Sequence, residues 1–240
     1  MSETALDVDH SVARADPDRW LASRFVDDRE ARADLIALYA FDHELARALA
    51  VASEPLMAEI RLTWWSEALD EMFERRPVRA HPVAQALALA VQRRGLARGP
   101  LDSLIDARLH RIDDAPFADE GALFAHLDGT AGAVMQAAAA VLGRDDGLPA
   151  VQSAGRAWGL ARAAVELSPE YLPQSLTPDR IRAMTRQAIA GARKALQDLP
   201  VKAFPAVAYI TLAPAYAAGR RPGLLEKQAR LLWAVASGRV

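Results

Sequence analysis

The chain has no cysteine, and it has no stretch in which apolar and polar residues alternate as they do along a β-strand. The lack of cysteine excludes disulfides and thiolate metal sites, and it suits a reducing compartment. The lack of strand signals leaves helices as the only regular element that we expect. An excess of charge of one sign is also missing. The formal net charge of −2 provides no global attraction to nucleic acid, so no nucleic-acid partner is expected.

Long apolar runs are scarce as well. The longest uncharged stretch, residues 203–219, is interrupted by Pro205 and Pro214, and it predicts a kinked core helix over about 205–219 rather than a membrane span. Residues 1–16 are polar and acidic, with no apolar run suited to a signal peptide and too much acid for a transit peptide. We therefore expect a disordered lead over residues 1–16, followed by one domain over residues 17–240.

Helix signals, in contrast, are frequent. About a fifth of the chain is alanine, which has the highest intrinsic helix propensity. Asp16 before Pro17, Asp28, and Ser53 before Pro55 are typical helix starts, and Gly95 is a typical end. These signals and the apolar spacing predict one all-α domain of about nine or ten helices. The expected helices cover about 16–25, 28–50, 53–75, 82–95, 100–112, 119–143, 148–167, 178–199, 205–219 and 222–237.

Familiar catalytic motifs are not found. The sequence contains no P-loop, no dinucleotide fingerprint, no nucleophile elbow and no histidine pair at i,i+4. An acidic cluster at helical spacing is expected to be a solvated helix face, with a displaced metal site as the alternative. Its members are Glu67, Asp70, Glu71 and Glu74. Glu30 and Asp34 are expected to pair at the surface with nearby arginines. Arg93 and Arg94 are expected to lie near the C-terminal end of a helix, where the helix dipole favours positive charge.

Several segments, in order, resemble the squalene/phytoene synthase family over roughly residues 17–238. They are LIALYAFDHELA, SEPLMAEIRLTWWSEALDEMF, HPVAQAL, LIDARLHRIDDAPF, LFAHLDGTAGAVMQAAAAVLG, GRAWGLARAAVEL and YLPQSL. The resemblance implies a helical isoprenoid (terpenoid) synthase fold. It also implies an ancestral chemistry in which two isoprenoid diphosphates are joined head to head, with magnesium held by aspartates on two facing helices.

The aspartates of that family are missing here. With Tyr39 as the anchor, the first aspartate set falls on Ala46, Arg47 and Ala50, and the matching positions of the second helix fall on Gly159, Arg162 and Glu166. The resemblance thus implies a vestigial pocket without catalytic, cofactor-binding or metal-binding residues. Its expected members are Tyr39, Ala46, Arg47, Ala50, Gly159, Arg162 and Glu166. We further expect an ion pair between Arg47 and Glu166, joined by Arg162, in place of the missing cations.

The chain also resembles a degenerate branch of the family, the respiratory complex I assembly-factor-like proteins, which lack the catalytic aspartates. This likeness favours a non-catalytic binding or assembly factor over an enzyme. The partners that it implies are an isoprenoid or other lipid, a protein of a respiratory complex and at most peripheral membrane contact, in the cytoplasm or at the inner membrane. The alternatives are an active prenyltransferase with relocated magnesium ligands, and an interaction module with a collapsed cavity.

Overall fold

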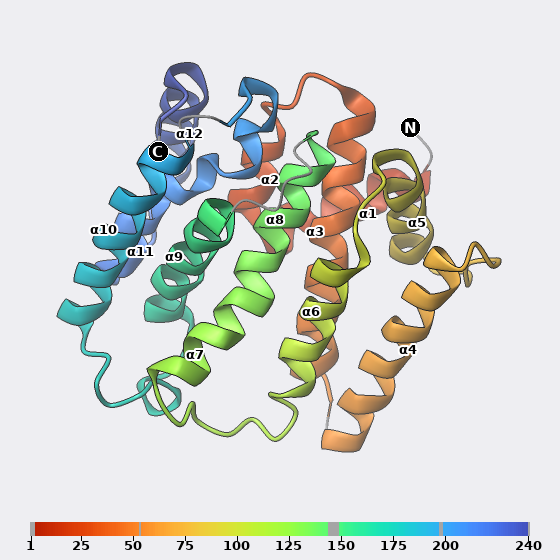
Figure 1. The fold of residues 1–240 in the computed structure, drawn as a ribbon, viewed down its shortest axis with the longest axis horizontal. Helices are drawn as coiled ribbons and strands as arrows, with labels where there is room; N and C mark the ends of the chain where they lie inside the picture. Colours follow the sequence, from red (N-terminus) through yellow and green to blue (C-terminus); the bar gives the residue numbers. More distant parts are fainter. Residues whose placement is uncertain (1–2, 53, 144–148, 197–198, 240) are drawn as a thin grey trace.

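The computed structural model describes residues 3–52, 54–143, 149–196 and 199–239, in which every regular element is a helix. Figure 1 shows them gathered in one bundle with α3 (Arg29–Ala50) near its middle, so the expectation of a single all-α domain is confirmed. The other α-helices are α1 (Glu3–Ala15), α2 (Pro17–Ser23), α4 (Pro55–Phe73), α5 (Pro82–Arg94), α6 (Arg98–Leu109), α7 (Glu120–Leu127), α8 (Ala133–Val141), α9 (Pro149–Glu166), α10 (Pro178–Ala195), α11 (Ala213–Ala217) and α12 (Leu224–Ser237). A π-helical turn, η1 (Asp128–Gly132), and the 3₁₀ segments η2 (Pro169–Tyr171), η4 (Val201–Ala206) and η5 (Ala208–Leu212) complete the set.

Local start and stop signals place most helix ends correctly. The side chain of Asp16 accepts a hydrogen bond from a backbone N–H of the first turn of α2, and Asp28 does the same for α3. Gly95 ends α5 in the left-handed conformation, with φ of 62°, which a residue without Cβ adopts readily. The predicted cap Ser53 and the predicted helix start at Leu148 lie outside the described residues.

The prediction of a disordered lead over residues 1–16 is wrong, because helix α1 occupies most of it. Val8 and Val12, spaced i,i+4, are both buried, and α1 packs against α3 and α5. The carboxylate of Asp9 forms an ion pair with Arg24 at 2.5 Å and so ties α1 to the end of α2. Two apolar side chains in an acidic segment are a weak sequence signal, and the helix is docked by them together with the contacts of Asp9.

The helix expected over residues 119–143 is interrupted by the π-helical turn η1. Within this turn Thr130 donates its hydroxyl to a carbonyl one turn back, a bond that competes with the regular helical ladder. Helix α9 comes very close here. A Cβ at Gly155 would lie 2.6 Å from the Cα of Gly132, so only glycine allows this approach.

The segment expected to form one kinked helix over about 205–219 is instead two 3₁₀ turns, in η4 and η5, followed by the short α11. Pro205 and Pro214 each remove a backbone donor, which prevents a continuous α-helical ladder. The segment is nevertheless core, since nearly all of its side chains are buried. None of the described helices is both long and apolar enough to span a membrane.

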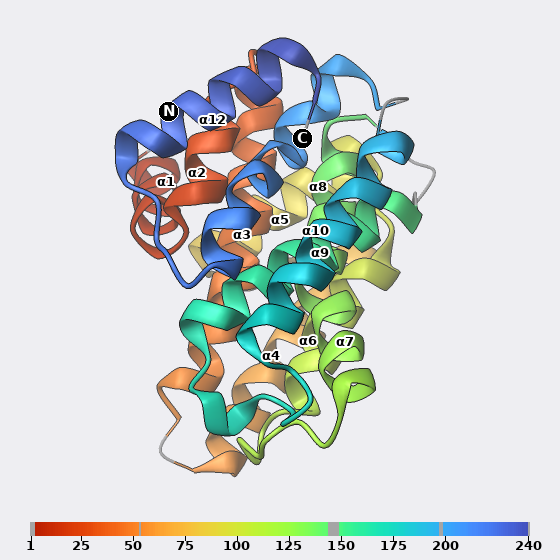
Figure 2. The same cartoon turned by 90° about the vertical axis from the view of Figure 1, so that its left-hand side faces the viewer.

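The order in which the helices pack against one another determines where the candidate site lies. Helix α8 contacts both α3 and α9, and α9 is covered on its other side by α10 and α11 (Figure 2). Since α3 and α9 have α8 between them over part of their length, they do not close on each other along their whole faces.

Candidate functional site

A cavity of about 290 Å³, which we call the arginine cavity, lies between α2, α3, α6, the η1 turn and α9. Five of the seven residues expected in a vestigial pocket line it. They are Tyr39, Ala46, Gly159, Arg162 and Glu166. The two helix faces predicted from the sequence therefore do meet at one cavity.

The other two expected residues lie elsewhere. Ala50 lines a neighbouring cavity of about 550 Å³. Arg47 lies in a groove between α3 and α4, beside Trp64 and His81. Consecutive residues of a helix point about 100° apart, and here Ala46 faces the arginine cavity while Arg47 faces the groove beside α4.

The expected ion pair between Arg47 and Glu166 is wrong. Arg47 is 59% exposed and lies 3.6 Å from Glu44, one turn away on its own helix. Glu166 instead accepts a hydrogen bond of 2.6 Å from Nε of Arg162, at i,i+4 on α9. Of the expected three-residue arrangement, only the contact between Arg162 and Glu166 is present.

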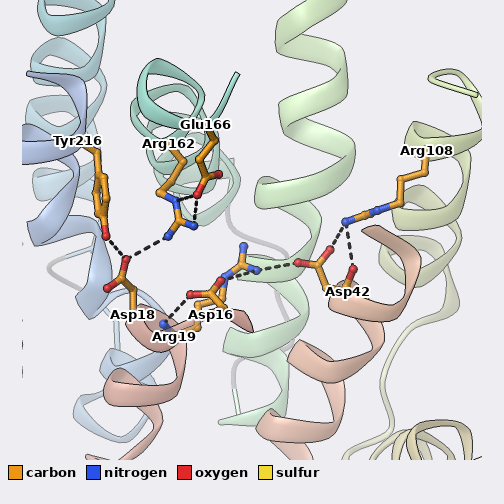
Figure 3. A network of polar contacts seen from close by, with 8 residues as sticks. All are labelled: Asp16, Asp18, Arg19, Asp42, Arg108, Arg162, Glu166 and Tyr216. Atoms are coloured by element: carbon orange, nitrogen blue, oxygen red, sulfur yellow. Dashed lines mark hydrogen bonds and ion pairs between the residues drawn. The ribbon is translucent and has the colours of Figure 1, made fainter. Parts of the chain in front are cut away.

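A carboxylate that is not among the residues predicted from the sequence, Asp42 of α3, also lines the arginine cavity. Figure 3 shows it between Arg19 and Arg108. Its Oδ2 accepts a hydrogen bond of 2.7 Å from Nη1 of Arg19, and its Oδ1 accepts one from Arg108 of α6. Asp16 lies 3.4 Å from the same nitrogen of Arg19. Both arginines are buried, so three helices are joined through one acid.

The electrostatics of this group follow from its partners. Burial alone would raise the pKa of Asp42, but Arg108 and Arg19 outweigh it and hold the pKa below its ordinary value. Asp42 is therefore ionised at neutral pH, and its charge is balanced by guanidinium groups.

A second buried acid, Asp18 of α2, is held from three directions. It lies 3.1 Å from Nη1 of Arg162, 2.7 Å from Nζ of Lys227 and accepts a hydrogen bond of 2.5 Å from the hydroxyl of Tyr216. Burial and this hydrogen bond raise the pKa of Tyr216, so the tyrosine stays protonated and keeps donating. Asp18 thus links α2 to α9, α11 and α12.

The residues of the arginine cavity do not fit magnesium. Magnesium prefers several carboxylate or water oxygens in octahedral geometry. Here Asp16, Asp42 and Glu166 each already contact an arginine, and no group of three or more potential ligand side chains converges on a point in the described part of the chain. The guanidinium groups of Arg19 and Arg162 would also repel a divalent cation.

His126 separates the arginine cavity from the 550 Å³ cavity and lines both. Its Nδ1 lies 3.1 Å from the carbonyl oxygen of Ala107, which fixes the proton on that nitrogen. Burial lowers the pKa of His126 to about 4. The larger cavity has an apolar side formed by Leu49, Ile112 and several alanines, and a polar side formed by Glu54, Arg111, Asp113 and Asp114.

The remaining acidic candidates form ion pairs away from this cavity. Glu67 and Glu71 contact Arg79, and Asp70 contacts Arg98, which favours the predicted helix face over a displaced metal site. Asp34 differs from expectation, because it is buried rather than superficial. Its partners are Arg93 at 2.8 Å and Arg94 at 2.7 Å, so this arginine pair ties α5 to α3 in addition to ending a helix.

One sequence signal could have revealed Asp42. Tyr39, Asp42 and Ala46 are spaced i, i+3, i+7, which places the acid on the buried face of α3. No local signal identifies Asp18, Arg19 or Arg108, because their partners lie on other helices.

Comparison with known proteins identifies the family and the fold of the chain. The model of the family described as squalene/phytoene synthase matches residues 12–169, which is well over half of the chain. The chain belongs to the squalene/phytoene synthase family. Two solved members have the same fold at low identity. A dehydrosqualene synthase has a TM-score of 0.81 at 12% identity, covering 98% of this chain and 96% of its own. Squalene synthase HpnC from Alicyclobacillus acidocaldarius has a TM-score of 0.70 at 16% identity, covering 98% and 94%.

Distant relatives of this chain carry the name NADH dehydrogenase (ubiquinone) complex I, assembly factor 6. The protein of Bos taurus is 29% identical over 117 residues, 49% of this chain and 35% of that protein. The protein of Rattus norvegicus is 32% identical over 110 residues, 46% of this chain and 33% of that protein. The match thus spans about a third of the length of these relatives.

Proposed function

We propose that this family member is a non-catalytic binding or assembly factor that uses the synthase fold without its chemistry. The observation that carries the proposal is that the carboxylates of the arginine cavity are neutralised by arginines of the chain itself. Departure of a diphosphate needs cations that can bind its oxygens, and these cations need free carboxylates to hold them. An acid already bound to Arg19 or Arg162 is a poor magnesium ligand.

The named relatives support an assembly role. They are called complex I assembly factors, and the resemblance covers about half of this chain. We infer that the protein acts in the biogenesis of a respiratory complex, through a protein partner, in the cytoplasm or in peripheral contact with the inner membrane.

The 550 Å³ cavity supports a retained ligand. Its volume falls within the range of small-molecule sites, and Ala46, Ala50 and Leu49 give it an apolar wall on α3. Alanine at two positions where the family resemblance places aspartate leaves both space and apolar surface. An isoprenoid or other lipid chain is the ligand that suits this wall, and the space argues against an interaction module with a collapsed cavity.

Two experiments test the proposal. First, the melting temperature is measured with magnesium plus a non-hydrolysable farnesyl diphosphate analogue, and separately with farnesol alone. A stabilising shift with farnesol that does not need magnesium is expected, because a ligand that binds the native state raises the melting temperature. A shift that appears only with magnesium and the diphosphate analogue, together with a coupled hydrocarbon product when farnesyl diphosphate itself is supplied with magnesium, would instead identify an active prenyltransferase.

Second, the gene is deleted and NADH oxidation is measured in membranes. A loss that the wild-type gene restores is expected. Normal complex I activity in the deletion strain would contradict the assembly role, whatever the first experiment shows about the ligand.

A further inference from the structure

The C-terminal helix α12 presents a continuous apolar face to solvent. Leu225, Ala229, Leu232 and Ala236 follow one another at spacings of four, three and four residues, and Trp233 lies beside them. Leu225 is 81% exposed, Leu232 58% and Trp233 54%. These are unusual values for large apolar side chains gathered on one helix face.

The opposite face of α12 explains why this one is not buried. Leu231 and Ala234 are fully buried, and α12 packs through that side on η5 and α2. Figure 2 shows α12 lying across the outer edge of the bundle. The helix therefore has one face in the core and a second apolar face with nothing against it among the described residues.

The segment that contains this face carries an excess of positive charge. Residues 220–239 hold five cations (Arg220, Arg221, Lys227, Arg230 and Arg239) and one acid, Glu226, for a formal charge of +4. The whole chain carries −2, so the other residues together carry −6. Lys227 is held inward by Asp18, and Arg220 and Arg230 both pair with Glu226, which leaves +1 from these three side chains. Arg221, which donates to the carbonyl oxygen of Val165, and Arg239 bring the formal charge of this segment without Lys227 to +3.

We propose that the outward face of α12 docks on the surface of an anionic lipid bilayer, with Leu225, Leu232 and Trp233 entering the headgroup region and the arginines contacting lipid phosphates. Amphipathic helices that lie in a membrane interface combine an apolar face containing Trp and Leu with flanking Arg or Lys. Tryptophan in particular favours the boundary between headgroups and acyl chains. Arginines near an anionic leaflet are attracted to it. The inference stands independently of the proposed assembly role.

A second copy of the chain suits this face less well. A helix of 14 residues is about 21 Å long and about 10 Å wide, which offers a footprint of roughly 200 Å². A stable protein interface needs about 800 Å² from each partner. Two copies would also bring two positive segments together, whereas an anionic lipid surface supplies the opposite charge.

The experiment measures sedimentation of the full chain with two kinds of vesicle, phosphatidylcholine alone and phosphatidylcholine mixed with phosphatidylglycerol. We expect binding to the mixed vesicles, weak binding to the neutral ones and release at high salt. Leu225→Gln with Leu232→Gln should weaken binding at least tenfold. Fluorescence gives a second signal, because Trp233 is the one exposed tryptophan of the five. Its emission should shift to shorter wavelength with mixed vesicles, and Trp233→Phe should remove the shift.

Matched controls show whether a loss of vesicle binding is specific to the substitutions on α12. Ile60→Gln replaces a side chain that is 52% exposed on α4, at the other end of the bundle, and should leave vesicle binding unchanged (Figure 2). The melting temperature shows whether each variant is folded. Binding that is unaffected by the double substitution, or is equal on neutral and anionic vesicles, would overturn the proposal. A lipid-free dimer that the double substitution abolishes, without vesicle binding, would overturn it in favour of a second copy.

Discussion

Nη1 of Arg19 lies 2.7 Å from Oδ2 of Asp42, so a buried ion pair joins the short α2 to the central helix α3. Arg108 of α6 holds the other oxygen of the same carboxylate. Removing one partner of a buried pair leaves the other charge without compensation, a loss of on the order of 3–5 kcal/mol. We expect Asp42→Asn to lower the free energy of unfolding by about this much, measured by urea denaturation.

The matched control is Glu74→Gln. Glu74 pairs with Arg76 at 2.7 Å, but both side chains are more than half exposed, and exposed pairs contribute about 1 kcal/mol or less. Equal losses for Asp42→Asn and Glu74→Gln would show that the buried network is not a main source of stability.

Arg47 is expected to contribute little. It is exposed, its contact with Glu44 is a loose one within a helix, and alanine suits a helix well. Arg47→Ala should change the free energy of unfolding by about 0.5 kcal/mol or less, and its effect should add to that of Glu166→Ala. A cycle with Arg162→Ala and Glu166→Ala should instead give coupling above about 0.5 kcal/mol, since these two side chains are in contact. Strong coupling of Glu166 to Arg47 would contradict the geometry.

Gly155 is expected to tolerate no side chain. A Cβ there would lie 2.6 Å from both the carbonyl oxygen of Ala131 and the Cα of Gly132, which are backbone atoms and cannot rotate away. Gly155→Ala should cost on the order of 1–3 kcal/mol through overpacking, read from thermal or urea unfolding.

Gly191 on α10 provides the comparison, because a Cβ there would meet nothing within 4 Å. Alanine lowers the backbone entropy of the unfolded chain, so Gly191→Ala should stabilise by about 0.5–1 kcal/mol. The same sign of effect at both glycines would argue against the close approach of α9 to the π-helical turn.

The lowered pKa of His126 predicts that the free energy of unfolding depends on pH. Its pKa falls from 6.5 to about 4 on folding, so between these values the unfolded chain binds a proton that the folded chain does not. Stability is therefore full above pH 6.5, decreases as the pH falls toward 4 and levels off below that. The amplitude should be on the order of 3 kcal/mol. His126→Asn keeps a donor toward the carbonyl of Ala107 and should flatten this part of the profile. An unchanged profile would assign the dependence to other groups.

The sequence predicted the helices well because their start and stop signals act locally. Asp16, Asp28 and Gly95 satisfy backbone groups within a turn of themselves, so their effect does not depend on the fold. Helix α1 was missed because it is stabilised by docking on α3 and α5 rather than by its own composition. The π-helical turn was missed for a similar reason, since it accompanies the close packing of α9.

The candidate site could be predicted in outline only. Family resemblance placed Ala46 and Glu166 at a common cavity, because helix faces follow from spacing. The pairing of charges could not be predicted, since Arg19 and Arg108 are 23 and 66 residues from Asp42 in the sequence. Tertiary packing decides which acid each arginine binds. The family resemblance also assigns the neighbouring positions Ala46 and Arg47 to one face of the helix, although their side chains point in different directions.

The guanidinium groups around Asp42 also have a consequence for how the bundle responds to its surroundings. A metal-bridged pocket keeps its geometry only while the ion is supplied, and it loosens under a chelator. Here the counter-charges of Arg19 and Arg108 are attached to the chain, so the fold itself holds them beside Asp42. We therefore expect the spacing between α2, α3 and α6 not to change when magnesium is added or removed.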